Sequence, residues 1–303
     1  MEKIAAEKES PIFVPSVTTR FFALFGNPLG FTASPWMHNH VFRKLGMDCL
    51  YSPYEIPEDG LETVVKNMGA FHIAGANVTM PFKAKVSKYL DALAESARTT
   101  EVVNTISVDA DGKKTGHNTD GEGFVRSLSD QMRLDVPNLK YVRFGTGGAA
   151  SAIACSLASK GVRTILTLCR DESSPHVENF RKHLDAHFPG VCTIRKMTDA
   201  SIRNDVAGRD VIINATKVGM FPKVDDVLFD TSVLGPDHVV CDVIYNPKET
   251  RLLVEAKKRG CRTLSGLWML VYQGAEAFRL WTGVTPPTDY MFETACRFFT
   301  ERA

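Results

Sequence analysis

The chain has 303 residues, of which 44% are hydrophobic, and its 36 basic side chains nearly balance its 35 acidic ones. This is ordinary globular composition, and without a long run of one charge sign nothing indicates binding to nucleic acid or to an anionic membrane surface. No apolar run approaches the roughly 18 residues that a membrane span needs. At roughly 100–200 residues per domain, the length favours two domains.

The seven cysteines are odd in number and scattered, without a CxxC pair. This pattern argues against a disulfide framework or a zinc site and fits a reducing cytoplasm. The eight histidines show no metal-ligand spacing either, so we expect no metal. Residues 1–10 are charged and polar, and they are expected to form a frayed leader before the first strand.

The first 120 residues alternate short apolar runs with helical patterns, bounded by turn residues. The predicted strands cover residues 21–25, 49–54, 71–78 and 105–108, the last opening a hairpin at 109–112. Helices are expected at 35–45, 61–68 and 83–93.

A second unit begins near Gly121. Its predicted strands are 141–144, 164–168, 211–214 and 239–243, and its predicted helices are 123–132, 151–160 and 252–259. Two further helices, at 267–281 and 289–301, complete the chain. Strands that alternate with helices indicate an α/β fold with mostly parallel sheets.

The predicted strand 141–144 leads directly into a loop with Gly145, Gly147 and, in the third place, Ala150. Between a strand and a helix this spacing is typical of a dinucleotide-binding loop. The glycines allow a tight turn and close approach to a pyrophosphate, which the amides of the helix N-terminus bind. The alternative is a tight strand–helix turn in another kind of α/β protein.

The next strand should end in the residue that reads the adenosine ribose, and here it ends in Arg170 and Asp171. A carboxylate at this place binds a 2′-hydroxyl and repels a 2′-phosphate, whereas a guanidinium suits a phosphate. Asp171 therefore favours NAD, and Arg170 leaves NADP possible. A solvated helix start is the alternative for Asp171.

Six segments, in this order along the chain, together resemble the shikimate dehydrogenase family. They are Gly26-Asn27-Pro28 with Ser34-Pro35 and His38-Asn39; Asn77-Val78-Thr79-Met80-Pro81-Phe82-Lys83; Val103-Asn104-Thr105-Ile106; Asn118-Thr119-Asp120-Gly121; the loop from Gly145 to Ala150; and Tyr245-Asn246-Pro247 with Gly266, Met269-Leu270 and Gln273.

The resemblance implies two α/β domains with a cleft between them. Residues 1–120 and 267–303 would bind the substrate, and residues 121–266 would form a Rossmann-type, doubly wound dinucleotide-binding domain. The segment 214–220 with Arg170 and Asp171 looks more like the quinate/shikimate dehydrogenase branch, which uses NAD as well as NADP. The implied reaction, within aromatic amino acid biosynthesis, is reversible oxidation of quinate or shikimate to 3-dehydroquinate or 3-dehydroshikimate.

By the same resemblance, Lys83 and Asp120 form the proton-transfer pair. An ammonium near the reacting oxygen can give a proton and stabilise negative charge. Taken alone, Lys83 would be a surface lysine at a helix start and Asp120 a helix cap. Which of the two carries the proton is open at this point.

The resemblance also assigns the residues of the binding sites. Those for substrate are Thr32, Ser34, Thr79, Asn104, Tyr245 and Gln273. Those for cofactor are Gly145, Gly147, Gly148, Ala149, Ala150, Arg170, Asp171, Thr216, Lys217, Gly266 and Met269. Capping of the following helix is the alternative for Thr32 and Ser34.

One departure leaves the substrate open. Where the family usually reads His-Ser-x-Ser-Pro, this chain has Phe31 and Thr32 before Ala33-Ser34-Pro35. An extra methyl group and an apolar ring in place of an imidazole can change the preference between related substrates by ~1–3 kcal/mol. Phe31, Trp36 and Met37 are expected to pack in the core rather than to line the ligand.

Two other functions compete with this interpretation. One is another two-domain dehydrogenase, such as a methylene-tetrahydrofolate dehydrogenase. The other is a ligand-sensing protein that has kept the fold without turnover, against which the presence of both Lys83 and Asp120 argues. The partner expected is a small hydroxy-carboxylic acid, and a homodimer is possible.

Overall fold

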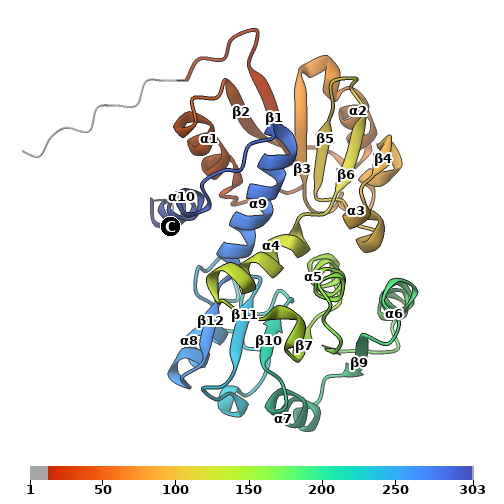
Figure 1. The fold of residues 1–303 in the computed structure, drawn as a ribbon, viewed down its shortest axis with the longest axis vertical. Helices are drawn as coiled ribbons and strands as arrows, with labels where there is room; N and C mark the ends of the chain where they lie inside the picture. Colours follow the sequence, from red (N-terminus) through yellow and green to blue (C-terminus); the bar gives the residue numbers. More distant parts are fainter. Residues whose placement is uncertain (1–12, 302–303) are drawn as a thin grey trace, which may run out of the picture.

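The computed structural model describes residues 13–301, which fold around two six-stranded β-sheets. The leader expected at residues 1–10 lies outside the described residues. In Figure 1 the sheet of the first half of the chain lies above the sheet of the second half. Helices α4 (Asp120–Arg126) and α9 (Gly266–Thr282) pass between them. The chain is thus a two-domain α/β protein, as expected.

The first sheet is mixed, with strand order β2-β1-β3-β5-β6-β4. Strands β1, β2 and β3 run parallel, β5 is antiparallel to both β3 and β6, and β4 is parallel to β6. The strands are β1 Arg20–Gly26, β2 Cys49–Glu55, β3 Ile73–Val78, β4 Ala92–Leu93, β5 Thr105–Val108 and β6 Lys114–His117. The helices around them are α1 Ser34–Lys44, α2 Leu61–Lys66, α3 Glu95–Thr100 and α10 Thr288–Glu301, with the 3₁₀ turns η1 Glu58–Gly60, η2 Met68–Phe71 and η3 Val86–Tyr89.

Strand β1 shows how this sheet is covered on both faces. Successive side chains of a strand point to opposite faces. Phe22 and Leu24 accordingly pack with α1, α9 and α10, while Ala23 and Phe25 pack with α2 and η3 on the other face. The C-terminal helices α9 and α10 thus complete the core of the N-terminal unit, although they are distant in sequence.

The second sheet is fully parallel, with strand order β12-β11-β10-β7-β8-β9. The strands are β7 Tyr141–Phe144, β8 Ile165–Cys169, β9 Cys192–Lys196, β10 Val211–Asn214, β11 Val239–Asp242 and β12 Arg262–Leu264. Its helices are α4 Asp120–Arg126, α5 Gly148–Ser159, α6 Pro175–His187, α7 Asp199–Ala207 and α8 Arg251–Lys258, with the π-helix η4 Ser127–Gln131 and the 3₁₀ turns η5 Val136–Asn138 and η6 Thr231–Val233.

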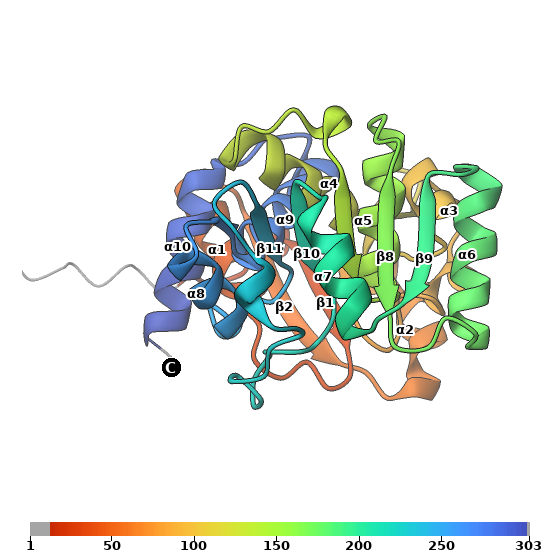
Figure 2. The same cartoon turned by 90° about the horizontal axis from the view of Figure 1, so that it is seen from below.

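Counted from β7, this order is that of the doubly wound dinucleotide-binding sheet. The order reverses between β7 and β10, and ligands of such sheets bind at the carboxyl ends of the strands at this point. Figure 2 shows β8 and β9 on one side of this sheet, with α6 beyond β9, and β10 and β11 on the other side, toward α8. The predicted dinucleotide loop follows β7 and therefore lies at the reversal.

Helices α4 and α9 approach closely because α4 carries Gly123. A Cβ atom there would lie 2.6 Å from the main-chain nitrogen of Gln273 and 2.9 Å from the carbonyl oxygen of Met269. Only glycine allows this contact without a shift of the α9 backbone. The contact fixes the start of the second unit against a helix of the first core.

The predictions for buried strands are confirmed, with β7 and β10 at the predicted residues. The helix predicted at 83–93 is wrong, because that segment forms turns, η3 and the short strand β4. The carbonyl oxygen of Lys83 accepts a hydrogen bond from the amide of Val103 at 2.9 Å, so it does not bond within a helix. Leu93 pairs with Gly116 instead of continuing a helical turn.

The elements that the sequence pattern missed are α3, α6, α7, β9 and β12. Strand β9 is an edge strand whose residues are exposed or half-buried, so it lacks the apolar run of the central strands. Helix α6 is mainly polar, and its buried face consists of Val177, Phe180 and Leu184. Their helical spacing was the available signal.

His38 of α1 is fully buried among aromatic rings, and its two ring nitrogens have no hydrogen-bond partner among the described residues. Its ring stacks on Tyr51 at 4.6 Å between centroids and lies 5.4 Å from the Trp281 ring. Burial lowers the pKa of His38 from 6.5 to about 3. The folded protein therefore keeps this imidazole neutral at mildly acidic pH.

We expect His38 to make the fold sensitive to acid. The unfolded chain binds a proton at this histidine below pH 6.5, so its contribution to stability is complete above pH 6.5 and decreases as pH falls toward 3. At pH 5 the loss amounts to about 2 kcal/mol. Urea unfolding of the wild type and of His38→Phe at pH 8 and pH 5 measures it.

The variant should lose less stability than the wild type between the two pH values. Other titrating groups, including Asp242, whose pKa burial raises to about 6, are common to both proteins and cancel in this difference. Equal pH dependence in the two proteins would contradict the assignment to His38.

Candidate active site

Lys83 and Asp120 lie in contact, as the sequence predicted for a proton-transfer pair. The Lys83 ammonium is 2.6 Å from Oδ2 of Asp120, and the two side chains are 26% and 10% exposed. Lys83 comes from the turn after β3, where its carbonyl bonds to Val103, and Asp120 is the first residue of α4. The pair is therefore partly buried but open on one side.

Asn104 holds the other oxygen of the same carboxylate. Its amide nitrogen donates to Asp120 Oδ1 at 2.8 Å and to the hydroxyl of Thr119 at 3.0 Å. Its amide oxygen accepts the main-chain amide of Thr119 at 2.8 Å. Asn104 was predicted to bind substrate, but both hydrogens of its amide group are directed to protein partners, so its clearest effect is to orient Asp120.

A buried chain of polar side chains continues behind Asn104. The Thr105 hydroxyl donates to Oδ1 of Asn104 at 3.0 Å and accepts from the amide of Asn77 at 3.1 Å. Oδ1 of Asn77 in turn accepts the hydroxyl hydrogen of Tyr51 at 2.9 Å. These three supporting residues were not predicted, although polar residues within the apolar strands β3 and β5 were the available signal.

Tyr245, from the second unit, is under the electrostatic influence of Asp120. It lies in the segment after β11, and burial followed by the negative charge of Asp120 raises the pKa of its phenol. The phenol is thus protonated and able to donate a hydrogen bond near the carboxylate. Its ring also packs against Phe299 of α10 at 5.9 Å between centroids.

The other predicted substrate residues lie on segments that surround this centre. Ser34 is buried at the start of α1, and the Thr32 hydroxyl accepts the amide of Ser34 at 3.3 Å. The N-cap of α1 is Ala33, and no side chain caps this helix. Thr79 follows β3, and its methyl group lies 2.4 Å from where a Cβ of Gly26 would be. Gln273 is half-buried on α9, and its amide group donates to the carbonyl of Leu270 at 2.8 Å.

The expected core packing holds for Met37, which is fully buried, and is wrong for Phe31, which is 41% exposed. The Phe31 ring lies 4.6 Å from that of Phe298 and 5.7 Å from that of Phe299 between centroids. The loop before α1 therefore meets α10 through aromatic rings, in the same group of rings that contacts Tyr245.

The loop after β7 has the geometry of a phosphate-binding turn. Gly145 has φ +103°, and a Cβ on it would lie 2.8 Å from the carbonyl oxygen of Ala215. A Cβ on Gly147 or Gly148 would meet open space. Gly147 is the N-cap of α5 and no side chain caps that end. The amides of an exposed helix N-terminus are therefore accessible to an anion, and the residues present fit a dinucleotide.

The segment after β10 lies against this loop and is held by hydrogen bonds. Oδ1 of Asn214 accepts from the amide and the hydroxyl of Thr216. The amide group of Asn214 donates to Oδ2 of Asp242 at 3.0 Å, and the hydroxyl of Thr250 donates to the same oxygen. Lys217 is exposed beside this fixed turn. Asp242 was not predicted, although an acid within an apolar strand was its signal.

Gly266 and Met269 lie at the start of α9, where the chain returns to the first unit. A Cβ on Gly266 would lie 2.3 Å from the carbonyl oxygen of Val243. Glycine is therefore required for α9 to begin against the segment that leads to Tyr245. Met269 is 8% exposed and packs in the core of the second unit.

Arg170 and Asp171 follow β8, where a dinucleotide-binding sheet reads the adenosine ribose. Both are exposed. Oδ1 of Asp171 accepts from the amide and the hydroxyl of Ser173, and these bonds lower the pKa of the Asp171 carboxyl. One oxygen of an ionised carboxylate thus remains for a ribose hydroxyl, beside an exposed guanidinium.

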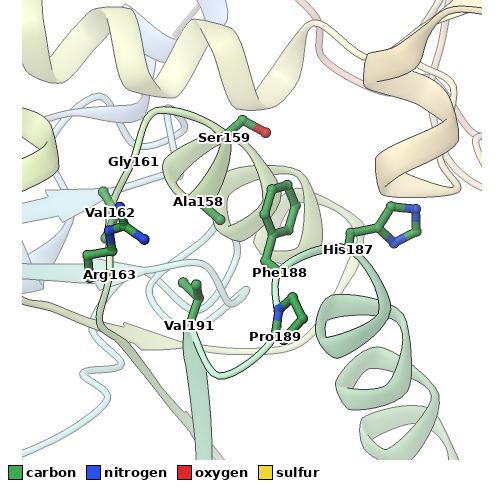
Figure 3. A pocket seen from close by; sticks show the side chains of 9 residues that line it. All are labelled: Ala158, Ser159, Gly161, Val162, Arg163, His187, Phe188, Pro189 and Val191. Atoms are coloured by element: carbon green, nitrogen blue, oxygen red, sulfur yellow. The ribbon is translucent and has the colours of Figure 1, made fainter.

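A separate cavity of about 360 Å³ lies at the opposite ends of the strands, near the starts of β8 and β9. Figure 3 shows Phe188 and Pro189 between its two basic side chains, Arg163 and His187. It contains none of the predicted site residues.

Within residues 13–301 there is no cluster of His, Cys, Asp and Glu suited to a metal ion. No helix of that part of the chain is long and apolar enough to cross a membrane.

Comparison with known proteins agrees with this geometry. Residues 24–106 match the model of the shikimate dehydrogenase substrate binding domain, and residues 266–295 match that of the shikimate 5′-dehydrogenase C-terminal domain. The chain is 40% identical over 284 residues to the shikimate dehydrogenase (NADP⁺) of Desulforamulus reducens, covering 90% of this chain and 93% of that protein.

Two solved structures have the same fold over nearly their whole length. The shikimate 5-dehydrogenase of Listeria monocytogenes, in complex with shikimate and NAD, is 36% identical with a TM-score of 0.87, covering 93% of this chain and 98% of that one. The quinate dehydrogenase of Corynebacterium glutamicum, in complex with NAD, is 32% identical with a TM-score of 0.83, covering 92% and 99%. This chain belongs to the shikimate dehydrogenase family.

Proposed function

We propose that this oxidoreductase catalyses the reversible, NAD(P)-dependent oxidation of shikimate, and of quinate as a second substrate, to the 3-dehydro acids. The observation that carries the proposal is the contact between Lys83 and Asp120. The charge of Asp120 also acts on the phenol of Tyr245, which follows β11 of the other unit. An ion pair in an apolar interior costs desolvation free energy. The Lys83–Asp120 pair is nevertheless kept in a partly buried position that remains open on one side, where it could exchange a proton with a substrate.

The residues of this chain supply the proton chemistry. Both oxygens of Asp120 accept from N–H donors, Lys83 on Oδ2 and Asn104 on Oδ1. Asp120 is thus held as an acceptor, whereas the Lys83 amine has hydrogens to spare. We infer that in reduction the Lys83 ammonium gives one proton to the carbonyl oxygen and becomes the neutral amine. In oxidation the neutral amine takes the hydroxyl proton and becomes the ammonium again, with Asp120 fixing its position.

A bound nicotinamide supplies the acceptor for the hydride. The pyrophosphate would lie on the amides of Gly147, Gly148, Ala149 and Ala150, while Thr216 and Lys217 would flank it on the adjacent segment. Gly266 and Met269 would lie near the nicotinamide, at the point where α9 joins the second unit to the first. The exposed N-terminus of α5 supports this placement.

For the substrate, we propose that Thr32, Ser34, Thr79 and Gln273 bind the carboxylate and ring hydroxyls. Quinate is included because the methyl of Thr32 and the ring of Phe31 change the wall of the pocket, and because a quinate dehydrogenase has the same fold. Within the proposal, residues 1–120 and 267–303 form the substrate-binding domain and 121–266 the cofactor domain.

We also propose a cytoplasmic location, because all seven cysteines are free thiols, as is usual in a reducing compartment.

The first test is a rate assay at 340 nm that crosses shikimate and quinate with NAD and NADP. Lys83→Ala should lower kcat by at least about a hundredfold, because it removes the proton-transfer group. Lys83→Arg should fail similarly, since a guanidinium does not release its proton. Lys85→Ala is the matched control. Lys85 lies two residues after Lys83 but pairs with exposed Glu58, so this variant should retain activity.

Two results would contradict the proposal. One is turnover by Lys83→Ala comparable to that of the wild type. The other is folded wild-type protein that binds shikimate or quinate without reducing either dinucleotide, which would identify a ligand-sensing protein.

We further propose that NAD is preferred and NADP accepted, on the basis of ionised Asp171 beside Arg170. Asp171→Ser should raise the ratio of kcat/KM for NADP to that for NAD on the order of tenfold, because it removes a charge that repels the 2′-phosphate. Glu172→Gln is the control, since Glu172 accepts the amide of Lys196 and faces β9. An unchanged ratio in Asp171→Ser would show that this carboxylate does not read the ribose.

Substitutions of Gly145 and Gly147, in the loop after β7, should affect different properties: the first the stability of the fold, the second the binding of the cofactor. Gly145→Ala should cost about 1–3 kcal/mol in urea unfolding, because an alanine is strained at φ +103° and meets the carbonyl of Ala215. Gly147→Ala adopts an allowed conformation, with φ −73° and open space around the new methyl. It should leave stability unchanged but weaken NADH binding about tenfold or more, because the methyl blocks the pyrophosphate. Unaltered NADH affinity in Gly147→Ala would place the pyrophosphate elsewhere.

A further inference from the structure

Arg143 is a fully buried arginine in the centre of the parallel sheet. It is the third residue of β7, two residues before Gly145, and is the largest of the fully buried side chains in the described part of the chain. Arginine is rarely found in such a position unless its charge is paired. The groups around Arg143 therefore show whether its charge is compensated within the protein.

The guanidinium of Arg143 bridges two segments of the proposed cofactor site. Nη1 donates to the carbonyl oxygen of Ala150, in the first turn of α5, and Nη2 donates to the Thr167 hydroxyl at 2.7 Å. Thr167 lies on β8, the strand that ends in Arg170 and Asp171. The cation thus lies below the loop that would hold the pyrophosphate.

No carboxylate neutralises this cation among residues 13–301. Burial lowers the pKa of Arg143, and the ionisable groups that act most against this shift are the thiols of Cys192, Cys155 and Cys169, of which Cys192 also accepts a hydrogen bond from the guanidinium. Burial raises the pKa of Cys155 to about 11 and also raises that of Cys169, so neither carries a negative charge at neutral pH. Nε of Arg143 is buried and has no hydrogen-bond partner in this part of the chain, and the Phe180 ring covers the guanidinium at 4.9 Å.

An unpaired buried charge destabilises a protein more than a neutral side chain of similar size does. The positive end of the α5 dipole lies on the same side, so the local field of the helix adds to that of the guanidinium instead of opposing it. Both fields attract an anion at the N-terminus of α5. The arrangement is unfavourable without an anion and favourable with one.

We propose that Arg143 is a positioning residue that acts through its charge on the dinucleotide, whose pyrophosphate supplies the counter-charge that the protein lacks. The inference rests on the proposed function, since it requires that the loop after β7 bind a dinucleotide. Arg143 is buried and does not touch the cofactor, so it acts across the first turn of α5. The effect concerns the pyrophosphate, which NAD and NADP share.

The test measures binding of NAD⁺ and NADP⁺ by calorimetry, and thermal unfolding of the protein without ligand. Arg143→Met should weaken binding of both dinucleotides by a similar factor, on the order of tenfold. The ligand-free variant should unfold at the same or a higher temperature than the wild type, because a buried cation has been replaced by an apolar side chain. Arg143→Lys, which keeps a cation, should retain most of the affinity.

Two matched variants distinguish an effect of the Arg143 charge from an effect of the packing around it. Thr167→Val removes the uncharged partner of the guanidinium, and Cys192→Ser replaces the thiol beside it; both should bind the dinucleotides as the wild type does. The proposal is overturned if Arg143→Met binds both dinucleotides normally, if it loses only NADP⁺, or if Thr167→Val weakens binding equally. If Arg143→Met does not fold, loss of affinity in folded Arg143→Lys also overturns it. A wild-type protein that binds neither dinucleotide would instead refute the proposed function.

Discussion

The carboxylate of Asp120 is the point on which the site depends. A nearly buried carboxylate requires donors on both oxygens, and here they are Lys83, from the turn after β3, and Asn104, directly before β5. Asp120 also begins α4, the helix that carries the chain to the second sheet, and Gly123 fixes that helix against α9. The same residue thus sets the position of the lysine and lies where the two units join. Because Tyr245 approaches from the second unit, any change in how the units pack would alter the surroundings of this carboxylate.

Much of this fold could be predicted because its central strands are buried on both faces. Strands β7 and β10 are short apolar runs, and such runs followed by turn residues are legible in sequence. The conformation of the segment after Lys83 could not be predicted in this way, because it depends on contacts such as the hydrogen bond from Val103, twenty positions later. Strand β9 was missed because an edge strand needs only partial burial, which leaves no apolar run to detect. Local patterns predict what local burial determines, and contacts between distant residues determine the remainder.

The same distinction applies to the site. Lys83 and Asp120 could be named from the order of six short segments, but nothing in those segments shows that Thr105 and Asn77 continue the hydrogen bonds of Asn104 into the sheet. Asp242 supports the segment after β10 in a comparable way, through Asn214. These residues share a property that sequence does show: each is polar within a run of apolar strand residues. A buried polar group must find partners, so an exception in an apolar run indicates a structural or functional constraint even when its partner is unknown.

The hydrogen-bonded centre and the wall of the proposed substrate site are built in different ways, which has a consequence for specificity. The centre is a closed network of amides, hydroxyls and one ion pair, in which replacing a member leaves another buried group unsatisfied. The wall near Phe31 consists of rings from the loop before α1 and from α10, and Phe31 is 41% exposed. Contacts of this kind tolerate changes in shape far better than a hydrogen-bond network does. If the proposed function holds, substrate preference can change at Phe31 and Thr32 while the contact between Lys83 and Asp120 is preserved, which is consistent with a loop that departs from the family pattern in a chain that keeps both residues.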